Sequence, residues 1–109
     1  MKTKVTLALA VLAVGGVTVA SSADVQANWT KHCASCHGKD GKGQTKAGKM
    51  AGVKDQTDAK YQATLTDDKM FKSIKEGLKD GDKIKMKPAE GLSDDEIKAL
   101  VAHVRSFKK

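Results

Sequence analysis

The segment KHCASCHGKDG, from Lys31 to Gly41, contains both cysteines of this 109-residue chain. Only two residues separate Cys33 from Cys36, and His37 follows the second cysteine directly. The chain has no other thiol with which either cysteine could pair. A disulfide between the two would close a very small loop and would constrain the unfolded chain little. The segment therefore needs another explanation for holding two thiols and an imidazole so close together.

The order C-x-x-C-H is the attachment signature of a c-type haem. Two thiols three positions apart can add to the two vinyl groups of the macrocycle, and the adjacent histidine can then bind the iron. A haem would also supply an apolar centre, which a chain this short has difficulty building from its own side chains. We therefore expect Cys33 and Cys36 to attach one haem c covalently, with His37 as its proximal iron ligand.

Three other interpretations of the segment stay open at this point. The cysteines could form a dithiol–disulfide pair of the oxidoreductase type, although no strand–helix–strand pattern surrounds them. A zinc site would need four ligands, and the only further histidines are His32 and His103. The match could also be a chance occurrence in a loop. A signal for export and the absence of further cysteines favour the haem.

The first 23 residues have the composition of a secretory signal peptide. Two lysines stand in the first four residues, residues 5–14 carry no charge, and small residues follow up to Ala23. This order of basic head, apolar stretch and small-residue exit is typical of exported proteins. A membrane-spanning helix would need ~20 apolar residues, and Gly15 and Gly16 interrupt this stretch. We therefore exclude residues 1–23 from the fold.

The predicted domains are a signal peptide over residues 1–23 and a single domain over residues 24–109. We place the cleavage after Ala23, and cleavage after Ala20 or Ala27 would also be compatible with the pattern. Export predicts a soluble periplasmic protein without stable membrane insertion after cleavage. The net charge of +7 comes from lysines that are interleaved with acidic residues, which argues against a nucleic-acid partner.

The C-terminal residues give the clearest helical pattern, from Ser93 onward. Ser93 and Glu96 have the spacing of a capping box. Acidic residues occupy the first turn and basic residues the last, as the helix dipole favours. Apolar residues recur on one face: Ile97, Leu100, Val101, Val104 and Phe107. The segment is therefore predicted to be an amphipathic helix that packs through this face.

Two further helices are expected. Thr66 can cap a second helix that ends at Gly77 and whose apolar face holds Met70, Phe71 and Ile74. A shorter first helix should run from about Asp24 to His32. Residues 38–55 are rich in glycine and lysine and are predicted to form a loop. Because no segment alternates over the length of a strand, the sequence predicts an all-α domain.

These features together resemble a class I single-haem c-type cytochrome, of the small kind that bacteria export to the periplasm. The segment CASCHGKDGKG is similar to the binding motif of that family with its glycine-rich sequel, and LSDDEIKALVAHVRSF is similar to its closing helix. The resemblance covers essentially all of residues 24–109. It implies a small all-α fold in which three or more short helices surround the covalently attached haem.

The resemblance also implies a sixth iron ligand on the far side of the haem, and we expect it to be Met86. Met86 lies in a loop just before the closing helix, where Pro88 stiffens the chain. Met70 is better explained by packing on the second helix, and Met50 follows too soon after His37 to reach the opposite face. An uncoordinated surface methionine is the alternative for Met86.

Three departures from the pattern of the family concern the surroundings of the haem. His103 stands where an aromatic residue usually packs on the first helix, so a packing role is expected for it. Val25 occupies the place of a glycine in that helix. Pro88 is the only proline, so the chain lacks the proline whose carbonyl oxygen usually accepts the proximal histidine's N–H. The outer-shell partner of His37 is therefore not identified.

Ligation by histidine and methionine leaves the iron no open site, which predicts a one-electron carrier between redox proteins and not an enzyme. The alternatives are a haem peroxidase or gas sensor with a labile sixth ligand and, more distantly, a thiol–disulfide oxidoreductase. Lys83, Lys85 and Lys87 surround the expected sixth ligand and could meet an acidic docking surface on a redox partner. We expect the carrier to be a monomer.

Overall fold

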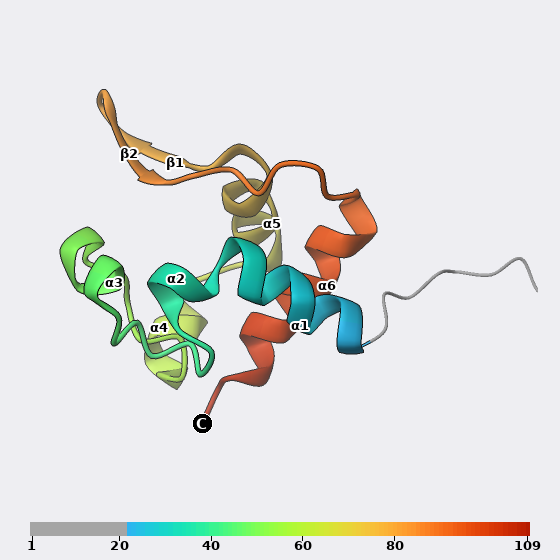
Figure 1. The fold of residues 1–109 in the computed structure, drawn as a ribbon. Coiled ribbons are helices and arrows are strands. Elements are labelled where there is room, and N and C mark those ends of the chain that lie inside the picture. The colour runs from blue at the N-terminus through green and yellow to red at the C-terminus, as the bar shows by residue number, and fades with distance from the viewer. Residues whose placement is uncertain (1–21) are drawn as a thin grey trace, which may run out of the picture.

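The computed structural model describes residues 22–109. These residues form helices and one β-hairpin (Figure 1), in the order α1 (Ser22–His32), α2 (Ala34–His37), α3 (Lys46–Ala51), α4 (Ala59–Ala63), α5 (Asp67–Glu76), β1 (Leu78–Asp80), β2 (Lys83–Met86) and α6 (Asp94–Ser106). The predicted signal peptide lies outside the described residues except for the first two residues of α1, and its cleavage site stays a prediction. No helix in residues 22–109 is long and apolar enough to cross a membrane.

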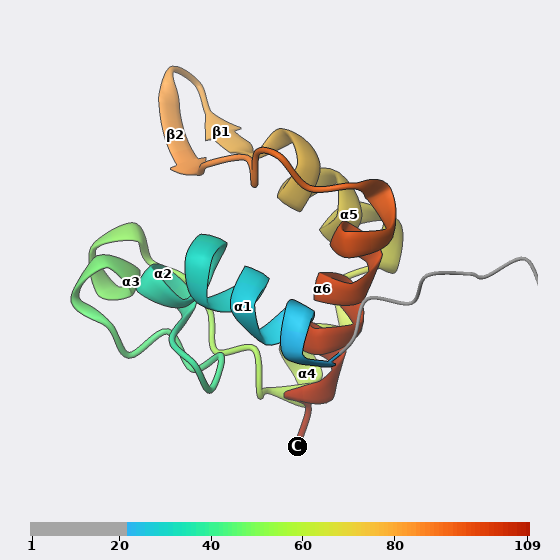
Figure 2. The ribbon, with the colours of Figure 1, turned by 45° about the vertical axis from the view of Figure 1, so that its right-hand side comes forward.

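The predicted all-α class is confirmed in that the described residues are mostly helical, with helices at all three expected places: α1, α5 and α6. The last helix is central, since α6 packs against both α1 and α5 (Figures 1 and 2). Its predicted apolar face is buried, with Ile97 1% and Leu100 0% exposed. The buried apolar side chains of the described residues are few: Trp29, Cys33, Met70, Ile74, Ile97, Leu100, Val101 and Val104.

Hydrogen-bonding caps fix where the long helices begin. The predicted capping box at the start of α6 is present: the Glu96 backbone N–H donates to Ser93 Oγ, and the Ser93 N–H donates to Glu96 Oε1. The other carboxylate oxygen of Glu96 accepts from Asn28 Nδ2 at 3.1 Å, which joins α1 to the start of α6. Thr66 caps α5 as predicted, since its hydroxyl accepts from the Lys69 N–H.

A buried glutamine and an arginine join α4 to the end of α6. Gln62 is 1% exposed, and its Nε2 donates to the carbonyl oxygens of Gln56 at 2.6 Å and Val104 at 2.7 Å. The Arg105 guanidinium donates to the carbonyl oxygens of Gln62 at 2.8 Å and Leu65 at 2.6 Å. These bonds give further partners to backbone carbonyl groups near the end of a short helix, where the regular helical bonds stop. The segment before α4 is thereby fixed to the core.

The hairpin of β1 and β2 was not expected from the sequence. The strands pair antiparallel, with Leu78 opposite Met86 and Asp80 opposite Lys83, and a bulge follows Leu78. Every residue of the two strands is exposed except Met86, which is half-buried, so no apolar alternation marks them. The Gly81–Asp82 pair is the available signal, because a glycine in the first position favours the two-residue turn of a hairpin. Gly81 has a φ of 58° in that turn.

The predicted loop over residues 38–55 contains one short helix, α3, and this part of the prediction was wrong. The Thr45 hydroxyl accepts from the Gly48 N–H at the start of α3, and Gly52 ends it in the left-handed conformation. A helix of six residues is too short to show a repeating apolar face, and its stability depends on tertiary contacts. The same applies to α2 and α4.

His103 packs in a cluster of aromatic rings, as the sequence analysis expected. Its ring centroid lies 5.2 Å from that of Trp29 on α1 and 4.8 Å from that of Phe107. Trp29 and Phe107 also lie 5.2 Å apart, and a Cβ on Gly41 would meet the Phe107 ring. The Nε2 atom of His103 is buried without a hydrogen-bond partner among residues 22–109. Burial lowers the pKa of His103 below its ordinary 6.5.

The aromatic cluster predicts an acid-sensitive contribution to stability. Because the folded-state pKa of His103 is lowered, the unfolded chain takes up a proton below about pH 6.5 before the folded chain does. The free energy of unfolding should therefore fall as the pH drops through this range. Urea unfolding at pH 7.5 and 5.0 should show a smaller pH effect in His103→Phe than in the wild type. An unchanged pH effect in His103→Phe, or an equal reduction in the control His32→Phe, would contradict this.

Candidate functional site

One turn of backbone carries all three residues of the C-x-x-C-H motif. Cys33 is the residue that precedes α2, and its carbonyl oxygen accepts from the N–H groups of Cys36 at 3.2 Å and His37 at 2.9 Å. No disulfide joins the two cysteines. Cys33 is buried and Cys36 half-buried. The turn therefore presents two thiols and an imidazole from a single short element.

Contacts on two sides hold this turn in place. The Trp29 carbonyl oxygen accepts from the Cys33 N–H at 2.9 Å, and Trp29 Nε1 donates to the Gly38 carbonyl oxygen at 2.9 Å. On the other side, the Thr45 hydroxyl donates to the Cys36 carbonyl oxygen at 2.8 Å. A Cβ on Gly48 of α3 would collide with that same oxygen. The glycine of α3 thus allows the close approach of α3 to the motif.

Two adjoining cavities open beside the motif. The first, here called the inner cavity, has about 650 Å³ of empty space and reaches the α5 and α6 side chains Ile74 and Val104. The second, the outer cleft, has about 1310 Å³ and extends between the segment after α3 and the hairpin. The two share five lining residues: Cys33, His37, Tyr61, Leu78 and Met86. Because the two cavities share these residues, we treat them as one site.

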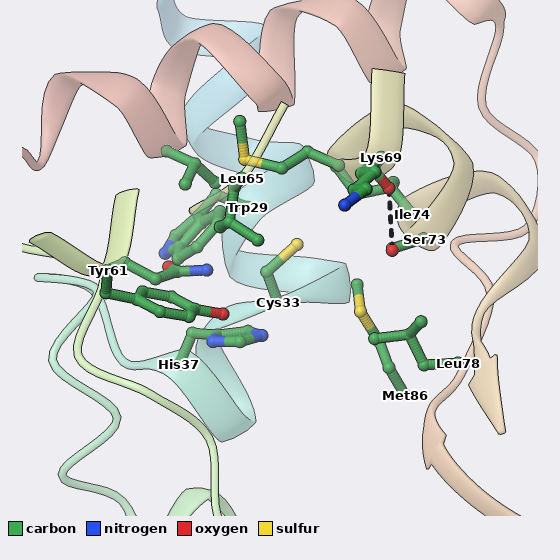
Figure 3. Close-up of a pocket in the computed structure, with 13 residues that line it drawn as sticks. Trp29, Cys33, His37, Tyr61, Leu65, Lys69, Ser73, Ile74, Leu78 and Met86 are labelled. Carbon is green, nitrogen blue, oxygen red and sulfur yellow. Dashed lines mark hydrogen bonds between the residues drawn. The ribbon is translucent and has the colours of Figure 1, made fainter. Parts of the chain in front are cut away.

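The structure brings three of the four predicted site residues to both cavities, and Cys36 lines the outer cleft. In Figure 3 the His37 ring and the Met86 thioether lie on opposite sides of an open space, and the Cys33 thiol lies above His37. Two apolar side chains at this site are largely exposed, Leu78 at 47% and Ile84 at 55%. The lining therefore suits a large apolar group with a nitrogen donor on one side and a sulfur donor on the other.

His37 is prepared to act as a neutral ligand. Burial lowers the pKa of His37 below its ordinary 6.5, so the imidazole carries no charge at neutral pH and one ring nitrogen keeps its lone pair. Its Nδ1 atom is buried without a hydrogen-bond partner within residues 22–109. The outer-shell partner that the sequence left unidentified is therefore absent from the described part of the protein.

Two observations argue against the rival interpretations of the motif as a dithiol oxidoreductase and as a zinc site. Burial, followed by the influence of the Cys36 thiol, raises the pKa of Cys33 from 9.0 to about 11. A dithiol oxidoreductase needs a thiolate and hence a lowered pKa. Within residues 22–109 no group of three or more His, Cys, Asp or Glu side chains is placed to hold a metal ion, whereas a structural zinc site needs four ligands.

The three methionines of the described residues differ in their position. Met86 lines both cavities. Met70 is 7% exposed in the core, as its predicted packing role requires, and also lines the inner cavity. Met50 is 79% exposed on α3 and lines neither cavity.

The backbone before the hairpin fixes the position of Met86. Gly77 has a φ of +77°, and a Cβ there would lie 2.5 Å from the Met86 carbonyl oxygen and 3.0 Å from Pro88 Cδ. The Ala89 N–H also donates to the Ile74 carbonyl oxygen at 2.9 Å, so the chain after Met86 is bound to the end of α5. The sequence pointed to Gly77 as a helix stop only; its contact with Met86 is tertiary.

Two polar residues of the site were missed in the sequence, Gln56 and Tyr61. Both line the inner cavity, and the Tyr61 hydroxyl points into the open space of Figure 3. Tyr61 is the only tyrosine of the sequence, and this alone was weak evidence that it belongs to the site. Gln56 gave none, because an isolated glutamine between helices has no recognisable pattern.

The fold and this arrangement of thiols, imidazole and thioether suit a haem-binding protein that transfers electrons, and comparison with known proteins supports that class. The sequence model of the cytochrome c family matches residues 22–108, and the chain belongs to that family. The earlier resemblance is thus confirmed, together with the fold class. Members of the family bind haem covalently and transfer electrons.

Solved structures give the same assignment. The structure described as KustC0563 c-type cytochrome has 36% sequence identity and a TM-score of 0.68, over 77% of this chain and 96% of that chain. A tyrosine-to-phenylalanine mutant of Kustc0563 also has 36% identity and a TM-score of 0.67, over 78% of this chain and 99% of the mutant. No match was found among curated proteins.

Proposed function

We propose that this protein is a periplasmic one-electron carrier with one haem c per chain, attached through Cys33 and Cys36. His37 and Met86 are the two axial ligands of the iron in this proposal, and the protein is not an enzyme. The observation that supports it most directly is that Cys33, His37 and Met86 line the same two cavities. The family assignment supports the haem and the electron transfer.

His37 and Met86 have different roles at this site. When bound, the haem supplies the one-electron couple of its iron. His37 offers a neutral imidazole nitrogen, held by a turn that Trp29 and Thr45 fix. Met86 offers a soft thioether, which favours ferrous over ferric iron and gives a higher potential than a second histidine would. Apolar side chains such as Ile74 line the inner cavity beside both donors.

Absorption spectra and carbon monoxide binding test the ligand pair. The ferric wild type should show the methionine-to-iron charge-transfer band, and the reduced wild type should not bind carbon monoxide. Met86→Ala should lose the band and bind carbon monoxide, because its sixth position is open. The matched control Met70→Ala should keep the band and lose about 2–5 kcal/mol of stability as a buried methionine.

The same spectra distinguish an electron carrier from a gas sensor or peroxidase. A wild type without the band that binds carbon monoxide would contradict the carrier and favour the gas sensor or peroxidase. Loss of the band in Met70→Ala, with Met86→Ala unaffected, would show that the ligand was assigned to the wrong methionine.

Gly77 gives a second, independent test of Met86. Gly77→Ala adds a Cβ against the Met86 carbonyl oxygen, whereas Gly81→Ala adds one at a φ of +58° with nothing within 4 Å. Both variants should lose ~1–3 kcal/mol, because an L side chain is strained at a positive φ. Only Gly77→Ala should also weaken the charge-transfer band and admit carbon monoxide. Equal spectra in the two variants would show that Gly77 does not position the ligand.

The proposed partner is a redox protein with an acidic docking surface. Lys83, Lys85 and Lys87 are exposed, and the last two line the outer cleft. Lys85 Nζ lies 3.9 Å from Asp80 Oδ2, but an exposed pair at this distance is weak and leaves the lysine available. The predicted signal peptide supports the periplasmic location, and the carrier is proposed to act as a monomer.

Small redox complexes of opposite charge test this basic surface. The double variant Lys85→Glu, Lys87→Glu should react ~10-fold more slowly with ferricyanide at low salt and faster with tris(phenanthroline)cobalt(III). Added salt should reduce both differences. Lys98→Glu changes a lysine of α6 that lines neither cavity of the site, and it serves as the control. Equal rate changes in the control would mean that only net charge matters.

A further inference from the structure

Gln56 is a buried polar residue that the fold does not satisfy. It is 9% exposed and lines the inner cavity. Its side-chain oxygen Oε1 is buried without a hydrogen-bond partner among the described residues. Leaving a buried amide group unpaired costs about 1–3 kcal/mol, so its persistence at the wall of a cavity points to a partner inside the cavity.

The backbone of Gln56 is fixed on both sides. Its N–H donates to the Gly41 carbonyl oxygen at 2.8 Å, and its carbonyl oxygen accepts from Gln62 Nε2 at 2.6 Å. Gln62 is itself tied to Val104 of α6 and receives a bond from Arg105 at its carbonyl oxygen. The Gln56 side chain is therefore presented to the cavity from a rigid position, which is what a preorganised binding group requires.

The amide can serve as a donor as well as an acceptor. It carries one accepting oxygen and two N–H donors. Because Oε1 has no hydrogen-bond partner among the described residues, no bond to this oxygen prevents the amide group from turning over. Rotation about the last side-chain torsion, which is a soft one, exchanges the oxygen and the nitrogen. The N–H donors can then face a negatively charged group in the cavity.

The haem of the proposed function carries such groups, namely its two propionate carboxylates. A carboxylate taken out of water needs hydrogen-bond donors or a counter-charge. The inner cavity is lined mainly by apolar side chains, and the Ser73 hydroxyl is already engaged as a donor to the Lys69 carbonyl oxygen. Gln56, with Tyr61 and Lys69, is one of the few donors left.

We infer that the Gln56 amide donates a hydrogen bond to one propionate carboxylate of the haem and thereby positions it. The inference rests on the proposed function, because it assumes a haem in this site. Gln56 is a positioning residue in this proposal. It contacts the haem away from the iron, and its hydrogen bond favours the ionised form of one carboxylate. An ionised carboxylate favours ferric over ferrous iron, so its protonation makes the reduction potential depend on pH.

The charged and titratable groups that face the inner cavity are shared by the wild type and the variants proposed below. They are Cys33 and His37 of the motif, Tyr61 of α4 and Lys69 of α5. Donation to a carboxylate favours its ionised form, and loss of the donor favours the protonated form. The effect of changing Gln56 on the pH profile can therefore be assigned to the carboxylate.

The test is a redox titration of the haem-loaded protein from pH 4 to 9. The pH-dependent step is the pH range over which the reduction potential changes. In Gln56→Leu the pH of this step should rise by about one unit. Gln56→Glu places a second carboxylate beside the first, and like charges should move the step upward further. Gln44→Leu, at an exposed position of the preceding loop, is the matched control and should leave the step in place.

The outcomes separate this inference from the proposed function. A lower stability of Gln56→Leu with an unmoved step in both Gln56 variants would overturn the inference and leave the carrier intact. If Gln56→Leu does not fold, the step in Gln56→Glu decides. A wild type without attached haem would instead overturn the proposed function.

Discussion

The carbonyl oxygen of Cys36 accepts a hydrogen bond from Thr45 and lies so close to α3 that position 48 has no room for a side chain. On the other side of the same turn, the Trp29 indole donates to the Gly38 carbonyl oxygen. One turn of helix is thus held between two neighbours. Because the two thiols and the imidazole leave from this turn, its position decides where a group bound to them must lie.

The two cavities occupy the place where a larger domain would have its core. α5 and α6 supply apolar side chains on one side, and the hairpin supplies largely exposed ones on another. A chain with so few buried apolar residues gains little from its own packing, so an apolar group in the cavities would add to the core. Binding to the folded state alone would then stabilise the fold. Cofactor attachment and folding are expected to depend on each other for this reason.

The sequence predicted the parts that local patterns determine. The motif, the capping box at Ser93 and the apolar face of α6 are encoded within a few turns of chain, and all were found where expected. The packing of His103 on α1 was also anticipated, and its contact there is Trp29. Met86 was selected by resemblance, and the structure places it at the cavities with His37.

The parts that were missed depend on tertiary contacts. The hairpin has exposed strands without alternation, and only its Gly81–Asp82 turn was visible in the sequence. α3 is too short to show a periodic face. Gln56 matters because Gly41 and Gln62, fifteen and six residues away, hold its backbone at the cavity wall. No local pattern records such a contact.

Covalent attachment is the central claim, and counting haem and thiols on the denatured, exported protein tests it most directly. After acid–acetone extraction, the account predicts one haem per polypeptide and no free thiol, because Cys33 and Cys36 are both consumed as thioethers. A colourless polypeptide with two titratable thiols would contradict it.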